Sequence, residues 1–275
     1  MVLASLLLGL LGSVALEKSR GTPVPVLMYH HFAPETGSDT VVTPEQFRRQ
    51  MTAIKEAGFT AVTLQQMLDY VEKGTPLPEK PVLITMDDGY TSNLTLAAPI
   101  LEELGLRATI FVIGVNEGQT IYLHSGNPLY PERFSYEEAA QWVEKGVLDL
   151  QCHTFDMHQL QSYGFSGRDG MLALAGESAA AHRKAIEEDL AQFRWRREGR
   201  VSTPLCALAY PYGYYDLEID GILAQLGYTI TFTTDELCSR LKEGDLSSLR
   251  MLGRFNVTEH WSGEDLVRRL EKAIK

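Results

Sequence analysis

The stretch Thr85-Met86-Asp87-Asp88-Gly89-Tyr90 follows directly on the apolar run Pro81-Val82-Leu83-Ile84. The apolar run is typical of a buried β-strand, and two adjacent aspartates stand where that strand ends. Their mutual repulsion and their loss of hydration oppose folding unless a cation or a proton offsets the charge. The pair therefore predicts a partner at the end of this strand.

Outward from this strand, extended apolar runs alternate with helical patterns along the whole chain. Strands separated by helices favour parallel pairing with right-handed crossovers. Seven or eight such units predict an α/β fold, an irregular (β/α)7-8 barrel with parallel strands, although the pattern alone does not decide whether the sheet closes. We expect strands near 25–29, 60–62, 82–86, 107–113, 147–152, 205–210, 228–233 and 251–257, and helices near 43–57, 63–72, 92–104, 177–196, 217–226, from 135 and from 263.

Ligands of α/β proteins gather at the carboxyl ends of the parallel strands. Four of the expected strands end in polar or aromatic residues, and all four groups should lie on one rim. They are Tyr29-His30-His31, Asp87-Asp88, the run HTFDMH from His153 to His158, and Tyr210-Pro211-Tyr212-Gly213.

His153 and His158 are five residues apart, which separates them by roughly 140° on a helix and puts them on opposite faces of a strand. A strand that ends at His153 and turns through Asp156 brings both imidazoles to one point, with Asp156 placed to orient a ring. With one aspartate of the pair they form a His₂-Asp set suited to a catalytic divalent metal. The competing interpretation is a hydrogen-bonded loop beside an Asp-Gly turn.

These motifs carry a resemblance to a known family. TMDDGY resembles the T-F-D-D-G motif of the polysaccharide deacetylases (carbohydrate esterase family 4, NodB homology domain), HTFDMH resembles their metal-binding histidine motif, and YPYG resembles the third motif, R-x-P-Y-G. The extra residue between the histidines, the opening VPVLMYHHF and the run RATIFVI are similar to the branch that acts on poly-N-acetylglucosamine. The resemblance covers roughly residues 23–257.

The resemblance implies a role for each matching residue. Asp87 would be the general base, and Asp88, His153 and His158 would hold the metal, with Zn²⁺ expected and Co²⁺, Ni²⁺ or Fe²⁺ able to bind the same set. The third motif, Pro211, Tyr212 and Gly213, would bind substrate, with the Tyr212 N–H facing the developing oxyanion.

Two departures from the family pattern concern the base and the acid. The arginine of the third motif aligns with Ala209, and the late Leu-x-x-His motif that supplies the general acid is not visible. Because the order of elements in the similar branch is circularly permuted, we predict that His30 is the acid, with His31 next. The competing interpretation of His30 is a hydrogen-bonded strand end.

Together these observations predict a metal-dependent hydrolase that removes N-acetyl groups from an N-acetylglucosamine-containing polysaccharide or oligosaccharide. Two alternatives remain: an O-acetyl esterase or small amide hydrolase with the same metal centre, or an inactive glycan-binding relative. The formal net charge of −11 argues against nucleic acid as a partner.

The first residues, MVLASLLLGLLGSVALEKSRG, are apolar or small through Leu16. We expect residues 1–22 to be a signal peptide or short N-terminal anchor and residues 23–275 to be the catalytic domain, working in an extracellular or cell-envelope location. The competing interpretation of the first segment is a buried helix. Cys152, Cys206 and Cys238 have no C-x-x-C spacing and are expected to be core residues, with one disulfide left open. His182 is expected on a helix surface.

Overall fold

The computed structural model describes residues 21–275. The expected signal peptide or anchor falls almost entirely on residues outside this part of the chain, so it stays a prediction. Among residues 21–275, no helix combines the length and the apolar character that crossing a bilayer requires.

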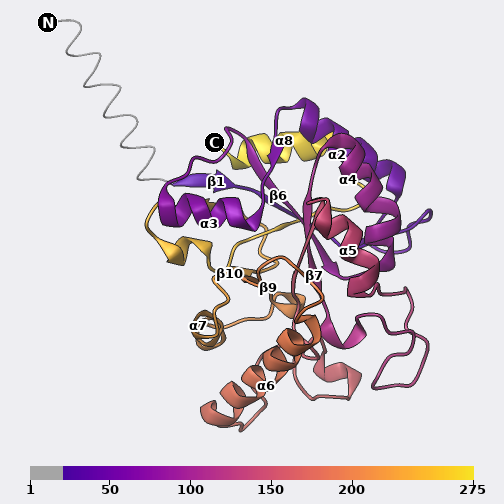
Figure 1. Cartoon of the computed structure of the whole chain (residues 1–275), viewed down its shortest axis with the longest axis vertical. Helices are drawn as coiled ribbons and strands as arrows, with labels where there is room; N and C mark the ends of the chain where they lie inside the picture. Colours follow the sequence, from indigo (N-terminus) through magenta and orange to yellow (C-terminus); the bar gives the residue numbers. More distant parts are fainter. Residues whose placement is uncertain (1–20) are drawn as a thin grey trace, which may run out of the picture.

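A parallel sheet forms the centre of the molecule, and helices surround it (Figure 1). Its strand order is β10-β9-β8-β7-β6-β2-β12, with β5 also paired to the start of β6, and every pairing in it is parallel. The strands are β2 (Val26–Tyr29), β5 (Thr60–Ala61), β6 (Pro81–Asp88), β7 (Ala108–Val112), β8 (Leu148–Cys152), β9 (Ala207–Ala209), β10 (Ile230–Phe232) and β12 (Phe255–Asn256).

The two edges of this sheet are linked through the segment 252–256. Leu252 makes a parallel bridge to Phe232 in β10, and three residues later β12 pairs with β2. The sheet therefore curls into an irregular barrel, which confirms the predicted fold class. Two small pairs lie outside it: β1 (Thr22–Val24) with β11 (Ser239–Leu241), and β3 (His31–Phe32) with β4 (Val41–Val42).

Most helices begin where the sequence places a capping residue. Thr63, Ser135 and Ser262 each form a reciprocal capping box with the residue three positions later. The expected helix at 92–104 starts instead with a turn of π-helix, Asn93–Ala97, before α4. The α-helices are α2 (Pro44–Glu56), α3 (Leu64–Lys73), α4 (Ala98–Leu104), α5 (Tyr136–Glu144), α6 (Ala179–Arg197), α7 (Leu217–Gln225) and α8 (Gly263–Ala273).

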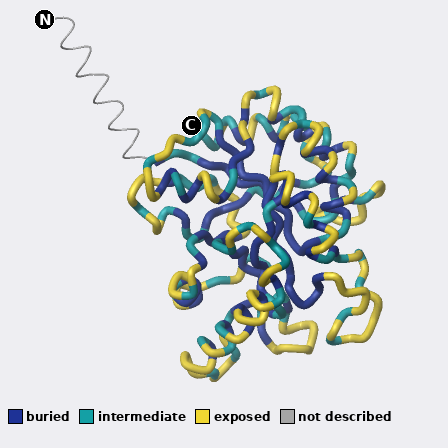
Figure 2. The backbone as a smooth tube through the Cα atoms, viewed as in Figure 1, coloured by how far each residue is buried: buried dark blue, intermediate teal, exposed yellow. Residues whose placement is uncertain are grey.

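The buried core lies along the central strands, and the exposed backbone lies in the outer helices and loops (Figure 2). All eight residues of β6 are buried, including Asp87 and Asp88. The expectation that His182 lies on a helix surface was wrong. His182 is on the buried face of α6, and its Nε2 donates to the Met171 carbonyl oxygen at 2.7 Å. The three cysteines are unbonded, and only Cys152 is fully buried.

Candidate metal centre and active site

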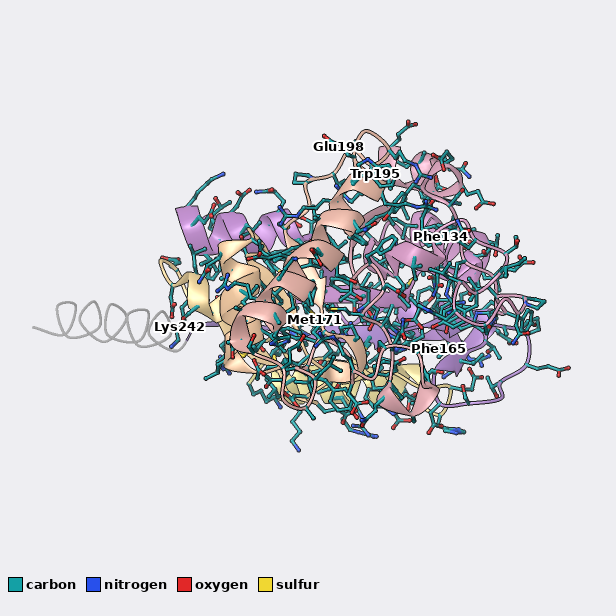
Figure 3. All side chains as sticks on the ribbon, turned by 90° about the horizontal axis from the view of Figure 1, so that it is seen from below. Phe134, Phe165, Met171, Trp195, Glu198 and Lys242 are labelled. Atoms are coloured by element: carbon teal, nitrogen blue, oxygen red, sulfur yellow. The ribbon has the colours of Figure 1, made fainter. Side chains whose placement is uncertain are left out.

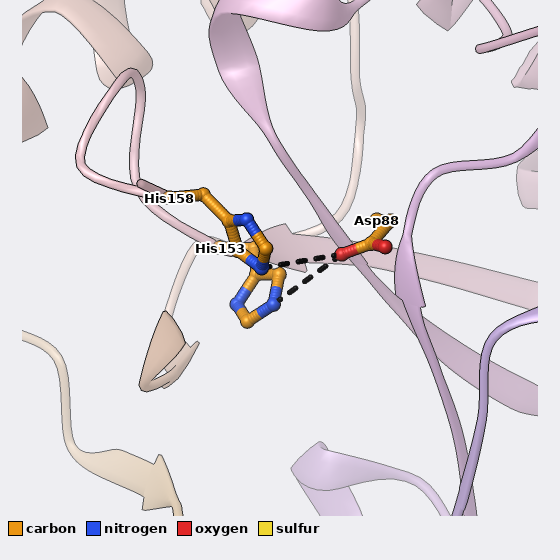
Figure 4. A group of neighbouring side chains, drawn as sticks. All are labelled: Asp88, His153 and His158. Carbon is orange, nitrogen blue, oxygen red and sulfur yellow. Dashed lines mark ion pairs between the residues drawn. The ribbon is translucent and has the colours of Figure 1, made fainter. Parts of the chain in front are cut away.

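Three side chains converge at the carboxyl end of the barrel. Asp88 ends β6, His153 follows β8, and His158 lies in the loop after it. Asp88 Oδ1 is 3.6 Å from His153 Nε2 and 3.4 Å from His158 Nε2, and both rings point at that oxygen (Figure 4). One ligand atom from each residue lies within 4.8 Å of the other two. The five-residue spacing is therefore resolved by a turn, as the sequence analysis required.

The chemistry of this donor set fits a divalent metal ion. His153 Nδ1 donates to the Ala209 carbonyl oxygen at 2.8 Å, which leaves Nε2 free to be a ligand. Asp88 Oδ1 is buried without a hydrogen-bond partner. In a tetrahedral site with bonds of about 2.0–2.2 Å, ligand atoms lie about 3.4 Å apart. The distances from Asp88 Oδ1 to the two ring nitrogens, 3.4 and 3.6 Å, are close to that spacing. Zinc, cobalt, nickel and iron all bind imidazole and carboxylate ligands of this kind.

The charges at this cluster favour the metal-binding forms of its ligands. Burial lowers the pKa of His158 to about 4, so its ring is neutral at neutral pH. Burial alone would raise the pKa of Asp88. Attraction to the positively charged forms of the His158, His30 and His153 rings outweighs burial and lowers this pKa well below its usual range. A neutral imidazole and an ionised carboxylate are the forms that bind a metal.

Asp87, the other member of the pair, is held by an arginine that the sequence analysis missed. Arg254 is fully buried, and its Nη1 and Nη2 donate to Asp87 Oδ1 and Oδ2 at 2.7 and 2.8 Å. Its Nε donates to the Thr233 carbonyl oxygen at 2.9 Å. Burial raises the pKa of Asp87, and the charges of Arg254 and His153 more than reverse this, so the pKa is lowered. Arg254 thus stands beside Asp87 although Ala209 occupies the motif position of the missing arginine.

Of the two histidines that follow the first barrel strand, His30 faces the site. His30 Nε2 lies 4.0 Å from Asp87 Oδ2, and its Nδ1 is buried without a hydrogen-bond partner. His31 is occupied elsewhere, because its Nδ1 bonds Ser92 Oγ at 2.9 Å and its ring packs against Tyr90 at 4.9 Å. The geometry therefore separates the two candidates.

The Pro-Tyr-Gly motif forms a single tight turn, Pro211–Gly213, directly after β9. Tyr212 has a left-handed backbone (φ 57°), and Gly213 has φ 75°. A Cβ on Gly213 would lie 2.0 Å from Thr234 Oγ1, so only glycine fits there. The N–H groups of Gly213 and Tyr214 bond carbonyls inside the turn. Within the described residues, the Tyr212 N–H has no backbone acceptor.

Aromatic rings extend from the metal cluster along the rim. The Tyr212 ring packs on His158 at 4.4 Å, and its hydroxyl lies 3.5 Å from the Tyr163 hydroxyl in the loop after the histidines. Tyr214 lies 6.3 Å from Tyr212 and is exposed. Tyr215 instead stacks on Tyr210 at 5.2 Å, so packing explains its position. Flat aromatic faces beside a reaction site suit the apolar face of a sugar ring.

Residues 74–231, more than half of the chain, match the family model described as polysaccharide deacetylase. The chain therefore belongs to the polysaccharide deacetylase family. The matched region contains Asp87, Asp88, both histidines of the cluster and the Pro-Tyr-Gly turn, but neither His30 nor Arg254.

Several curated proteins are similar in sequence to this chain. The chain is 24% identical over 251 residues to YxkH of Bacillus subtilis (strain 168), covering 91% of this chain and 77% of that protein. It is 27% identical over 195 residues to the poly-beta-1,6-N-acetyl-D-glucosamine N-deacetylase of Staphylococcus epidermidis, covering 71% of this chain and 62% of that protein. The enzyme of the same name from Escherichia coli (strain K12) is 26% identical over 215 residues, 70% of this chain, but the match spans only 31% of that longer protein.

Solved structures agree with the fold. IcaB from Ammonifex degensii is 25% identical, with a TM-score of 0.73 over 92% of this chain and 98% of that one. The de-N-acetylase from Aggregatibacter actinomycetemcomitans has a TM-score of 0.74 at 17% identity, covering 90% of this chain and 99% of that chain, which shows a shared fold.

Proposed function

We propose that this protein is a metal-dependent N-deacetylase that removes acetyl groups from an N-acetylglucosamine-containing glycan. The observation that carries the proposal is the arrangement of Asp87: it is paired with a buried arginine and lies next to a three-ligand cluster that fits a divalent ion. A binding protein gains nothing from an ionised carboxylate held beside a metal site. The named activities of the relatives from S. epidermidis and E. coli supply the substrate class.

Asp88, His153 and His158 would hold the ion, which when bound polarises a carbonyl and makes water more acidic. The chain's own groups then perform the proton transfers. Asp87 accepts a proton as water attacks the acetyl carbonyl carbon, and the Tyr212 N–H donates to the carbonyl oxygen as it becomes negative.

The new carbon–oxygen bond is followed by cleavage of the carbon–nitrogen bond. His30, whose Nε2 lies 4.0 Å from Asp87 Oδ2, donates a proton to the departing amine. The products are acetate and a glucosamine residue with a free amine. His30 and Arg254 thereby fill the roles of the two family residues missing from their usual motifs, which weakens the case for an inactive glycan-binding relative.

A screen of acetate release tests this function. Poly-N-acetylglucosamine fragments, chitooligosaccharides and acetylxylan are each incubated with the protein, with and without a chelator. We expect acetate from at least one N-acetylated glycan, lost on chelation and restored by Zn²⁺ or Co²⁺. Release from acetylxylan alone would assign an O-acetyl esterase, and metal binding without any acetate release would assign the inactive relative.

We also propose that the protein works outside the cytoplasm, in the extracellular space or cell envelope. The support is the apolar stretch of the first sixteen residues. N-terminal sequencing of the secreted and cell-bound fractions of a producing cell tests this location, and recovery of the uncut chain only from the cytosol would contradict it.

A further inference from the structure

The loop that joins the two histidine ligands, segment 153–158, is bonded to its surroundings through its backbone. On one side, its carbonyl groups are fixed by the short 3-10 helix Gly114–Asn116, which follows β7. The Gly114 N–H donates to the Thr154 carbonyl oxygen at 3.0 Å, and the Val115 N–H donates to that of Phe155 at 2.8 Å. Gly114 itself allows this approach, because a Cβ there would lie 2.8 Å from the Phe155 ring.

On the other side, a single carboxylate accepts the loop's N–H groups. Asp189 lies in the middle of α6, and its Oδ2 and Oδ1 accept from the N–H of Phe155 and of Asp156, both at 2.7 Å. Asp189 is only 9% exposed and lies on the buried face of α6 with Ile186 and Leu190, whereas Trp195 near the end of the helix is exposed (Figure 3). Hydrogen bonds of this length to an ionised acceptor are among the strong ones.

The backbone at Thr154 explains why both N–H groups face one way. Thr154 has φ 67° although it is β-branched, and it is fully buried. A left-handed residue among right-handed or extended ones turns successive N–H groups into a concave nest, which binds an anion. Here the anion is the Asp189 carboxylate, which belongs to the protein itself. Without it, these two part-buried N–H groups would lose their hydrogen-bond acceptor.

We propose that Asp189 is the positioning residue of the metal centre, acting through the loop backbone to set the distance between His153 and His158. The inference rests on the proposed function, because it takes those histidines as ligands. Asp189 touches neither ligand and stays remote from the reacting atoms. Its role is needed because the four residues between the histidines, 154–157, lie in no regular helix or strand and must bring the second ring back to the first.

The test measures Co²⁺ affinity by competition with a chromophoric chelator, together with the visible spectrum of the bound Co²⁺, in the full protein. The variants are Asp189→Asn, which keeps the shape, and Asp189→Ala, which opens the nest. The matched control is Glu188→Gln on the exposed side of the same helix, paired only to Lys184. We expect the Asp189 variants to bind Co²⁺ about 10–100-fold more weakly with an altered spectrum, as residues that orient ligands do, and the control to match the wild type.

Two further readouts separate positioning from a general packing role. In metal-free protein, amide hydrogen exchange at Phe155 and Asp156 should quicken in both Asp189 variants. Formate added to Asp189→Ala should refill the nest and restore the Co²⁺ spectrum, whereas a loss of helix packing would not respond to formate.

The outcomes distinguish this inference from the proposed function. Wild-type Co²⁺ affinity and spectrum in folded Asp189→Asn would overturn the inference while leaving the metal site intact. If Asp189→Ala does not fold, the isosteric variant and its exchange rates carry the test. A wild-type protein that binds no Co²⁺ would instead contradict the proposed function.

Discussion

Replacing Arg254 by methionine should impair the proposed base more specifically than it impairs the fold. Arg254 is fully buried and makes two charge-assisted bonds to Asp87, at 2.7 and 2.8 Å. Methionine keeps much of the volume and removes the charge, so Asp87 is left ionised in a buried site with its principal partner gone. Breaking a buried pair in this way costs about 3–5 kcal/mol of folding free energy.

Asp87 can escape part of that cost by taking up a proton, since Arg254 is a main reason that its pKa is lowered. The acidic limb of the pH–rate profile should therefore move upward by at least about one pH unit in the variant, and one unit corresponds to about 1.4 kcal/mol. The rate at neutral pH falls because the base is protonated. Metal content should stay at the wild-type level, since Arg254 touches no ligand.

The measurements are denaturant unfolding and acetate release from pH 4 to 9. The control is Arg250→Met, which breaks a less buried pair with Asp220 (2.7 Å; the side chains are 10% and 11% exposed) that bonds to neither Asp87 nor the ligand cluster. We expect both variants to lose stability and only Arg254→Met to shift the acidic limb. An unmoved limb in Arg254→Met, with stability lost as in the control, would refute the idea that Arg254 keeps Asp87 ionised.

The remaining predictions address the other parts of the site. His30→Asn should lower kcat on N-acetylated glycans by about 10²–10⁴-fold with metal content unchanged. It should leave kcat on 4-nitrophenyl acetate near the wild-type value, because that leaving group departs without a proton. Equal losses of kcat on both substrates would contradict an acid role. Asp88→Asn should lose most bound metal in elemental analysis, and full retention of metal and activity would remove it from the ligand set. Gly213→Ala should lower the free energy of unfolding, measured by denaturant titration, by about 1–3 kcal/mol, because Gly213 has a positive φ and Thr234 occupies the space of a Cβ. The control is Gly221→Ala, in a helix with open space around the glycine, which should leave stability unchanged or raise it. In chelator-treated protein, the free energy of unfolding should fall by up to about 3 kcal/mol from pH 6.5 to pH 4, because the histidine takes up a proton in the unfolded chain but stays neutral in the folded protein, where burial lowers the pKa of His158 to about 4. His158→Asn should flatten this dependence of stability on pH. An unchanged dependence in the variant would mean that another group causes it.

The positions of most helices and strands could be predicted from the sequence, because short runs of neighbouring residues mark where these elements begin and end. Caps such as Thr63 and Ser135 mark the helix starts, and the apolar run before Asp87 marks the central strand. Two irregular features could not be predicted from the sequence: the π-helical turn at Asn93–Ala97 and the shortness of β12. Tertiary contacts decide both, and neither has a distinct sequence pattern.

The site divides in the same way. Asp88, His153 and His158 were named because each sits in a recognisable cluster at a strand end. Arg254 could not be placed, because it reaches Asp87 from 167 positions away and lies in a segment that carries no spacing signal. A charged residue inside an expected buried strand was the one available hint, since buried arginines nearly always have a partner.

Backbone strain collects at the proposed site. Among residues 21–275, four non-glycine residues have positive φ, and three of them are Asp88, Thr154 and Tyr212. Each such residue costs on the order of 1–3 kcal/mol and persists only when its surroundings fix it. The three belong to a proposed metal ligand, the loop between the two histidines and the proposed substrate-binding turn, where successive groups must leave a strand in different directions. Asp189 bonds the two N–H groups that follow Thr154, and Gly213, which follows Tyr212, has no room for a Cβ. Residues next to the strained positions therefore help to fix the backbone of the proposed site.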